Sequence, residues 1–166
     1  MTVMSEQDWK SMSRFLDVLP KSGDKELTLL KVHLVIEEVL TLLIQKNCIN
    51  EKYVNEARLQ FNQKVKLARA FNEIHGADWI WKALQLLNKA RNHMSHNLTE
   101  QELASKVGAF TEYVEMNTSK LFEQEDNDKF SSFHMAAFNV YIPLAVFANF
   151  ELKRSEIKTL LTSRFS

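Results

Sequence analysis

Turn-forming residues are scarce in this chain, and that scarcity limits the folds open to it more than any other feature. The 166 residues include only 3 glycines and 2 prolines. A sandwich or barrel of many short strands needs such residues at its turns, so the composition favours long helices. The length and a hydrophobic content of 45% indicate one domain with a buried core. We therefore expect an all-α fold, a single helical bundle over residues 1–166.

Apolar residues recur at helical spacing in four consecutive segments, which we expect to form a four-helix core at about residues 25–122. The first is apolar on most sides, which is typical of a helix covered by others. Asp78 is a candidate N-cap for the third, and the sequence from Thr99 to Glu102 has capping-box form at the start of the fourth. The four segments cover about 26–46, 61–74, 78–97 and 99–121.

Helical extensions are predicted at both ends of this core. A short amphipathic helix covers 5–19, and a C-terminal helix or kinked pair covers about 129–164, bent or divided at Pro143. The stretch 133–150 is rich in apolar residues but interrupted by polar ones, so it predicts a buried or interface helix, not a membrane span. The aromatic residues of this end of the chain form first a packing surface, and because they exceed what one small bundle needs they also suggest a dimer contact. These residues are Phe130, Phe133, Phe138, Tyr141, Phe147 and Phe150.

Charge is balanced overall but unevenly distributed. The net charge of zero indicates neither nucleic acid nor membrane as a partner. Residues 58–98 carry a net charge of +5, however, and residues 99–128 carry −6. The basic residues could follow an RNA backbone, although any solvent-facing helix bears such charges. The candidates are Lys64, Lys66, Arg69, Lys82 and Lys89.

Two features bear on the cellular compartment and on covalent cross-links. Residues 1–10 lack the apolar stretch of a secretory signal, so we expect a cytoplasmic protein without a membrane partner. Cys48 is the single cysteine, which excludes an internal disulfide and a multi-cysteine zinc site. We interpret it as a small buried hydrophobic residue.

The heptapeptide Ala90-Arg91-Asn92-His93-Met94-Ser95-His96 combines groups suited to RNA cleavage near the end of the third segment. Arg91 can clamp a phosphate through paired N–H donors, and His96 can move a proton near neutral pH. On a regular helix the two diverge by about 140°, so they converge only where the helix end loosens. Strand cleavage needs both a base and an acid, and a two-fold dimer would supply two imidazoles in one cleft.

This arrangement resembles the HEPN domains, small helical bundles whose motif is Arg, a polar residue, a few variable positions and His. Arg91, Asn92, three further residues and His96 match its commonest form. The resemblance extends over about residues 26–122. A second pattern resembles relatives known as mannitol-operon regulators. Its residues are Phe61, Lys64, Leu67 and Ala68.

The HEPN resemblance implies symmetric homodimers and, in many members, metal-independent endoribonuclease activity in toxin–antitoxin, phage-defence or RNA-processing settings. It implies catalytic roles for Arg91 and His96, an orienting role for Asn92, products ending in a 2′,3′-cyclic phosphate, and no cofactor. One toxin subgroup has a Tyr two residues after the His, which a nucleotidyltransferase antitoxin modifies. Leu98 stands there in this chain, so an antitoxin or inhibitor protein would have to act in another way.

Other interpretations of these residues remain open. Arg91 could pair with Glu37 or Glu38 across the bundle, and one of these acids could orient it. His96 could cap a helix C-terminus. His93 and His96 have the spacing of a metal pair on one helical turn, but no third ligand is evident nearby. The competing function is a non-catalytic HEPN-like regulatory or assembly protein, although no helix-turn-helix pattern supports operator recognition.

Four further aromatic and imidazole side chains have structural and functional interpretations. Trp79 and Trp81 could stack on RNA bases, but one of them is expected in the core. His33 and His134 fall in apolar runs and are interpreted as satisfied buried or interface histidines.

Overall fold

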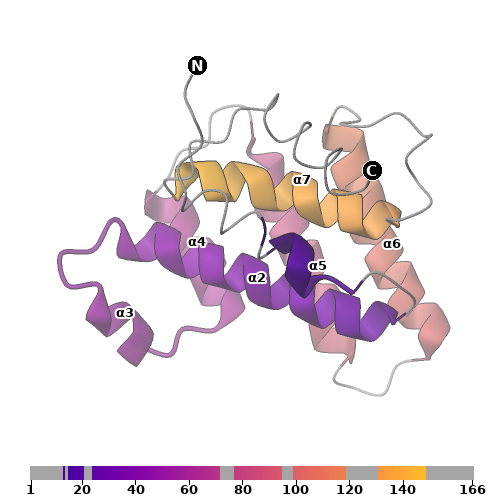
Figure 1. The fold of residues 1–166 in the computed structure, drawn as a ribbon, viewed down its shortest axis with the longest axis horizontal. Helices are drawn as coiled ribbons and strands as arrows, with labels where there is room; N and C mark the ends of the chain where they lie inside the picture. The colour runs from indigo at the N-terminus through magenta and orange to yellow at the C-terminus, as the bar shows by residue number, and fades with distance from the viewer. Residues whose placement is uncertain are drawn as a thin grey trace.

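Helices form the regular structure of the described chain. The computed structural model describes residues 13, 15–20, 24–71, 77–94, 99–118 and 131–148. Within these ranges no strand occurs, residues 15–18 are helical, and the predicted all-α bundle is confirmed. The helices that follow are α2 Lys25–Gln45, α3 Lys52–Glu56, α4 Phe61–Phe71, α5 Trp79–Met94, α6 Glu100–Asn117 and α7 Ser132–Phe147 (Figure 1).

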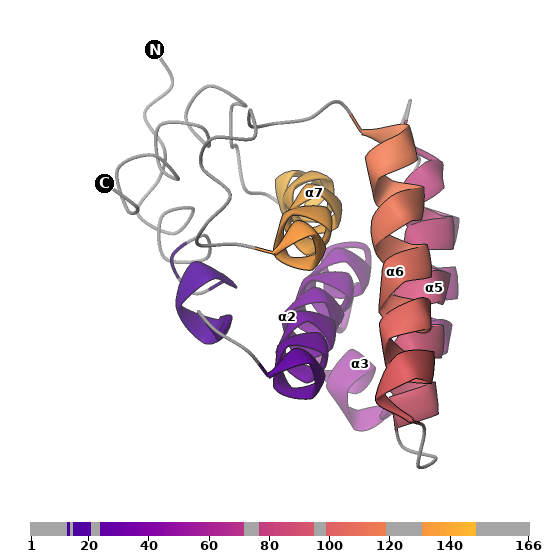
Figure 2. The same ribbon diagram turned by 90° about the vertical axis from the view of Figure 1, so that its right-hand side faces the viewer.

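The helices are arranged in two crossing layers. α2 and α7 run side by side in the same direction, and Lys46 Nζ beyond the end of α2 donates a 3.0 Å hydrogen bond to the carbonyl of Phe147 at the end of α7. α5 and α6 form a closely packed pair, which Figure 2 shows upright beside the nearly end-on α2 and α7. α4 packs against both α2 and α5, so it joins the two layers.

α2 is the central element of the core. It packs against α3, α4, α5 and α7, and 10 of its 21 residues are buried. Because neighbouring helices cover α2 on several sides, most of its positions are apolar. Full burial of each large aliphatic side chain contributes roughly 1.5–3 kcal/mol. The central position of α2 therefore follows from its composition.

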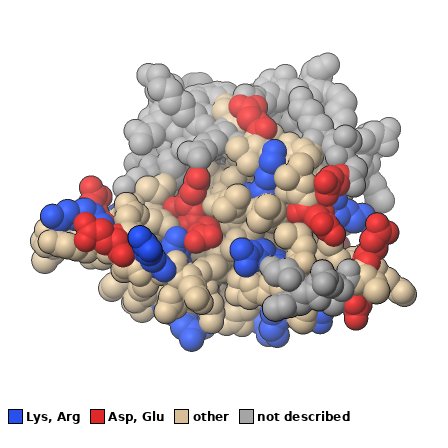
Figure 3. Space-filling view, turned by 90° about the horizontal axis from the view of Figure 1, so that it is seen from below, with Lys and Arg blue, Asp and Glu red and all other residues tan. Residues whose placement is uncertain are grey.

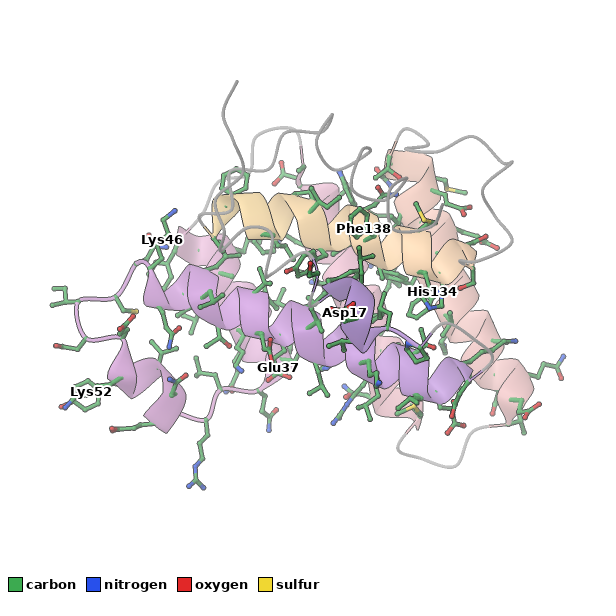
Figure 4. The ribbon with its side chains drawn as sticks, viewed as in Figure 1. Asp17, Glu37, Lys46, Lys52, His134 and Phe138 are labelled. Atoms are coloured by element: carbon green, nitrogen blue, oxygen red, sulfur yellow. The ribbon has the colours of Figure 1, made fainter. Side chains whose placement is uncertain are left out.

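α7 belongs to the same core as the four predicted helices, because it packs against α2, α5 and α6. Phe15 stacks on Tyr141 with ring centroids 4.4 Å apart and lies 5.5 Å from the ring of Phe138, labelled in Figure 4. Phe133, Phe138 and Tyr141 are buried inside the protomer, so the predicted dimer contact cannot use them.

None of the described helices has both the length and the apolar character that a membrane span requires.

Pro143 does not divide the last helix, contrary to one of the two predicted outcomes. α7 continues through it from Ser132 to Phe147. Proline removes one amide donor, which leaves the carbonyl of Asn139 without its usual partner, but the apolar packing of the flanking turns maintains the helix.

Other predicted features fall outside the described residues. They are most of the helix over 5–19, the end of the second segment at 72–76, Leu121, the acidic run 123–128, Phe130 and residues 149–164.

The capping box predicted before α6 is present. The Thr99 side chain accepts a hydrogen bond from the Glu102 amide at 3.4 Å, and the Glu102 carboxylate accepts one from the Thr99 amide at 3.2 Å. The interior face of α6 contains Leu103, Phe110 and Val114, which are buried, and Val107, which is partly buried against the core. Local capping chemistry therefore fixes where α6 begins after the motif-bearing segment.

Replacing Thr99 by Ala should lower the free energy of unfolding by about 1 kcal/mol, because the hydroxyl that accepts the hydrogen bond from the Glu102 amide is lost. Gln101→Ala is the matched control, since Gln101 is exposed in the same turn and takes no part in the cap. Urea unfolding followed by circular dichroism would measure both. Equal stability of the two variants would show that the cap contributes nothing.

Candidate functional site

The predicted motif lies in the last turn of α5. Arg91 is half-buried there and Asn92 is exposed. The Arg91 guanidinium lies near its neighbour's side chain, with Nη1 3.4 Å from Asn92 Oδ1. His96 lies outside the described residues, as do Ser95 and Leu98. The convergence of Arg91 and His96 therefore stays a prediction.

A polar cluster that joins three helices begins one turn before Arg91. Asn88 Oδ1 on α5 lies 3.3 Å from Nε2 of His33 on α2. On the other side of the ring, His33 Nδ1 lies 3.8 Å from Glu37 Oε2. Glu37 Oε1 accepts a 2.8 Å charge-assisted hydrogen bond from Nζ of Lys64 on α4. In Figure 4, Glu37 lies on the side of α2 away from α7. We call His33, Glu37, Lys64 and Asn88 the polar cluster.

Packing fixes the imidazole of His33 firmly in this cluster. The residue is only 4% exposed, and its ring stacks on Phe61 with centroids 4.0 Å apart. The Oδ1 atom of Asn88 can only accept a hydrogen bond, so Nε2 of His33 is assigned the proton as donor. His33 is therefore a satisfied buried histidine, as the sequence predicted.

The surroundings of His33 lower its pKa, so they favour the neutral imidazole. Burial lowers the pKa of His33 most, while the Asn88 hydrogen bond and the Glu37 charge raise it. The positive charges of Arg91 and Lys64 lower the pKa further. Arg91 follows Asn88 by about one turn on α5, so the motif begins beside the polar cluster.

Arg91 retains its charge for a ligand. The alternative pairing with Glu37 does not occur, because Glu37 binds Lys64. Across the part of the chain that the structure describes, Arg91 forms no ion pair. A guanidinium in this position presents a fork of N–H donors that fits two oxygens of a phosphate. The geometry therefore suits recognition of a phosphate or carboxylate.

The predicted RNA-contacting residues occupy two kinds of position. Lys66 and Arg69 on α4 and Lys82 and Lys89 on α5 are exposed. Lys64 differs from them, because its side chain is 15% exposed and bound to Glu37. Its ammonium therefore serves the polar cluster. Figure 3 shows acidic side chains interspersed with basic ones on the face opposite α7, with no continuous basic surface there.

The remaining candidates are structural in the described chain. Trp81 is 2% exposed and so cannot stack on an RNA base, while Trp79 is half-buried against the core. Cys48 is half-buried against the same core.

His134 is half-buried, with Nε2 3.1 Å from the Pro20 carbonyl and Nδ1 2.6 Å from Ser131 Oγ. Burial lowers the pKa of His134, and the Pro20 hydrogen bond opposes this. Among the described side chains no three His, Cys, Asp or Glu residues gather as a metal site.

Sequence reasoning missed the partners within the polar cluster. It considered Glu37 only as a partner for Arg91. The available signal was a polar residue within each of two otherwise apolar helix faces, His33 and Asn88, which a buried environment requires to be paired. Comparison with known proteins adds no assignment, since no family model, curated protein or solved structure matches the chain. The functional proposal therefore depends on this site.

The Glu37–Lys64 pair should stabilise the fold by about 1–2 kcal/mol of coupling free energy, a value reduced from that of a fully buried pair because both groups retain some solvent contact. A double-mutant cycle with Glu37→Gln, Lys64→Met and the combination, followed by urea unfolding, would measure it. Lys66→Met is the matched control on α4, because Lys66 is exposed. Strictly additive single effects would show that the pair is uncoupled.

Stability should fall as the solution is acidified from pH 7.5 to 5, because the folded state holds His33 and His134 with lowered pKa values. The unfolded chain then binds more protons than the native protein below the ordinary histidine pKa of about 6.5. His33→Gln should make unfolding free energy depend less steeply on pH in this window. His93→Gln serves as control because His93 is an exposed imidazole on α5. A slope that His33→Gln leaves unchanged would contradict the assignment.

Proposed function

We propose that the protein is a homodimeric, metal-independent endoribonuclease of HEPN type that cleaves single-stranded or looped RNA. Arg91, Asn92 and His96 of both protomers would form one composite active site. A toxin or phage-defence effector is the setting that this activity suits, and an antitoxin or inhibitor protein would restrain it. The proposal combines the sequence motif with the site at the end of α5.

The observation that supports the proposal most is the uncommitted charge of Arg91. An arginine with a purely structural role would be neutralised by an acid of the bundle. Here the acid expected to do so, Glu37, is bound to Lys64, and Arg91 forms no ion pair among the described residues. A cationic fork held at a helix end without an internal counter-ion is suited to an anionic substrate.

The chemistry assigns one role to each motif residue. Arg91 would bind the scissile phosphate and stabilise the negative charge that develops on it during attack by the 2′-hydroxyl. His96 of one protomer would remove the proton from that hydroxyl, and the partner subunit's His96 would protonate the departing 5′-oxygen. Asn92, whose Oδ1 lies 3.4 Å from Arg91 Nη1, would hold the guanidinium in position. The exposed basic residues Lys66, Arg69, Lys82 and Lys89 would follow the flanking phosphates.

Purified protein incubated with RNA in EDTA should produce fragments ending in a 2′,3′-cyclic phosphate at some pH between 5 and 9. Arg91→Ala and His96→Ala should each reduce the rate on the order of 100-fold or more, because each removes a group that acts in the transition state. Gel electrophoresis of end-labelled RNA, with enzymatic removal of the cyclic phosphate, would measure both rate and product.

Matched variants separate catalysis from folding. His93→Ala removes an exposed imidazole from α5 and should retain activity. Arg91→Lys keeps the charge but loses the fork, so it should lose most of the activity while keeping the helical spectrum. Intact RNA at every pH, or cleavage that survives in both Arg91→Ala and His96→Ala, would reject the nuclease. RNA binding without cleavage would favour the regulatory protein instead.

A further inference from the structure

The Ser131 hydroxyl and the His134 imidazole form a short hydrogen bond at the start of α7. Ser131 Oγ lies 2.6 Å from His134 Nδ1, and His134 Nε2 lies 3.1 Å from the Pro20 carbonyl oxygen. That carbonyl can only accept, so Nε2 is assigned the imidazole proton and Nδ1 accepts from the Ser131 hydroxyl. Burial lowers the pKa of His134, which favours the neutral imidazole. A hydroxyl, a neutral imidazole and a group that orients the imidazole are the parts of an activated serine nucleophile.

An open pocket of about 590 Å³ lies beside this pair, between the starts of α2 and α7 and one face of α6. Figure 4 shows His134 between the starts of α7 and α2. The volume is within the range of natural small-molecule sites. Both Ser131 and His134 line the pocket, so a bound molecule would meet the hydroxyl. The apolar part of the lining consists of Leu103, Ala104, Val107 and Phe133.

Two further features of the lining limit the kind of molecule that fits. A Cβ added at Gly108 on α6 would meet no atom within 4 Å, so this part of the wall leaves room for a ligand group. The carboxylates of Asp24, Glu112 and Glu115 line the pocket together with the ammonium of Lys25. Their net negative charge disfavours an anionic ligand. A neutral molecule with an alkyl group therefore fits the lining best.

We propose that Ser131 and His134 hydrolyse neutral carboxylic esters with short alkyl acyl groups, an activity separate from RNA cleavage. Ser131 Oγ attacks the ester carbonyl carbon while its proton passes to His134 Nδ1. The first amides of α7 have no acceptor within the helix, so they supply donors for the oxyanion that forms at this end. The ester C–O bond then breaks, and the alkoxide takes the proton from His134 and leaves as an alcohol. Water repeats the attack on the acyl group, releases the acid and restores the Ser131 hydroxyl.

Ser131 also caps α7, because its Oγ accepts a hydrogen bond from the His134 amide at 3.4 Å. Asparagine caps a helix about as well as serine but has no nucleophilic hydroxyl. Ser131→Asn should therefore keep the helical spectrum and the urea midpoint of the wild type while it loses the reaction. Ser105→Ala is the matched control, since Ser105 is exposed on α6 and lies outside the pocket lining.

Hydrolysis of 4-nitrophenyl butyrate by the full chain should lose on the order of 100-fold or more of its kcat/KM in Ser131→Asn and in His134→Gln, because each removes a group that acts in the transition state. Gly108→Leu should lower butyrate turnover relative to 4-nitrophenyl acetate by roughly tenfold, because the leucine takes the space of the acyl chain. Leucine is a better helix former than glycine, so α6 should stay folded. Absorbance of the released 4-nitrophenolate measures each rate.

A fluorophosphonate probe distinguishes a nucleophilic serine from unspecific reaction of the ester at the protein surface. The probe should form a covalent adduct on Ser131 of the wild type, located by mass spectrometry of its peptides. Ser131→Asn should stay unlabelled, and His134→Gln should be labelled far more slowly. A folded wild type without the adduct, or ester hydrolysis that Ser131→Asn leaves unchanged, would overturn the site. No RNA enters these measurements, so failure of RNA cleavage and failure of ester hydrolysis are separate results.

Discussion

The packing of α2 against its neighbours determines both the fold and the position of the site. This helix contacts α3, α4, α5 and α7, so an error in its rotation would displace each of them. Apolar burial alone is non-directional and would tolerate several rotations. The polar groups on the α2 flank restrict that freedom, because His33 and Glu37 find partners on α5 and α4 in only one arrangement.

The polar cluster therefore contributes specificity more than stability. Burying charged and polar groups costs free energy that their mutual interactions offset only partly, so replacement by apolar residues could be neutral for stability. What apolar residues could not supply is a fixed register among α2, α4 and α5. Arg91 follows Asn88 by about one turn on α5, so fixing Asn88 also fixes the face of α5 from which the Arg91 side chain leaves the helix. The cluster thus sets the position of the helix turn that carries Arg91, which forms no ion pair among the described residues.

Local sequence patterns predicted most of the helices, whereas they did not predict the contacts between segments that are distant in the sequence. The four core helices, the capping box at Thr99 and the buried face of α6 depend on spacing within a few residues, which the sequence displays directly. The pairing of His33 with Asn88 joins positions 55 residues apart, and the choice of Lys64 over Arg91 by Glu37 depends on how α4 packs. Whether the aromatic residues of α7 face the core or a partner is likewise a tertiary property that periodicity does not reveal. Arg91 and Asn92 were placed correctly at the end of α5, while the approach of His96 depends on residues beyond the described ranges.

The contacts of His33 and His134 limit which groups could carry protons in the proposed reaction. Cleavage by the 2′-hydroxyl needs one group that accepts a proton and another that donates one. His33 cannot be the second group, because it is buried against Phe61 and hydrogen-bonded to Asn88. His134 is engaged by Pro20 and Ser131 at the start of α7. The second proton carrier must then come from outside these two, and in the proposed homodimer the partner subunit's His96 would fill that role.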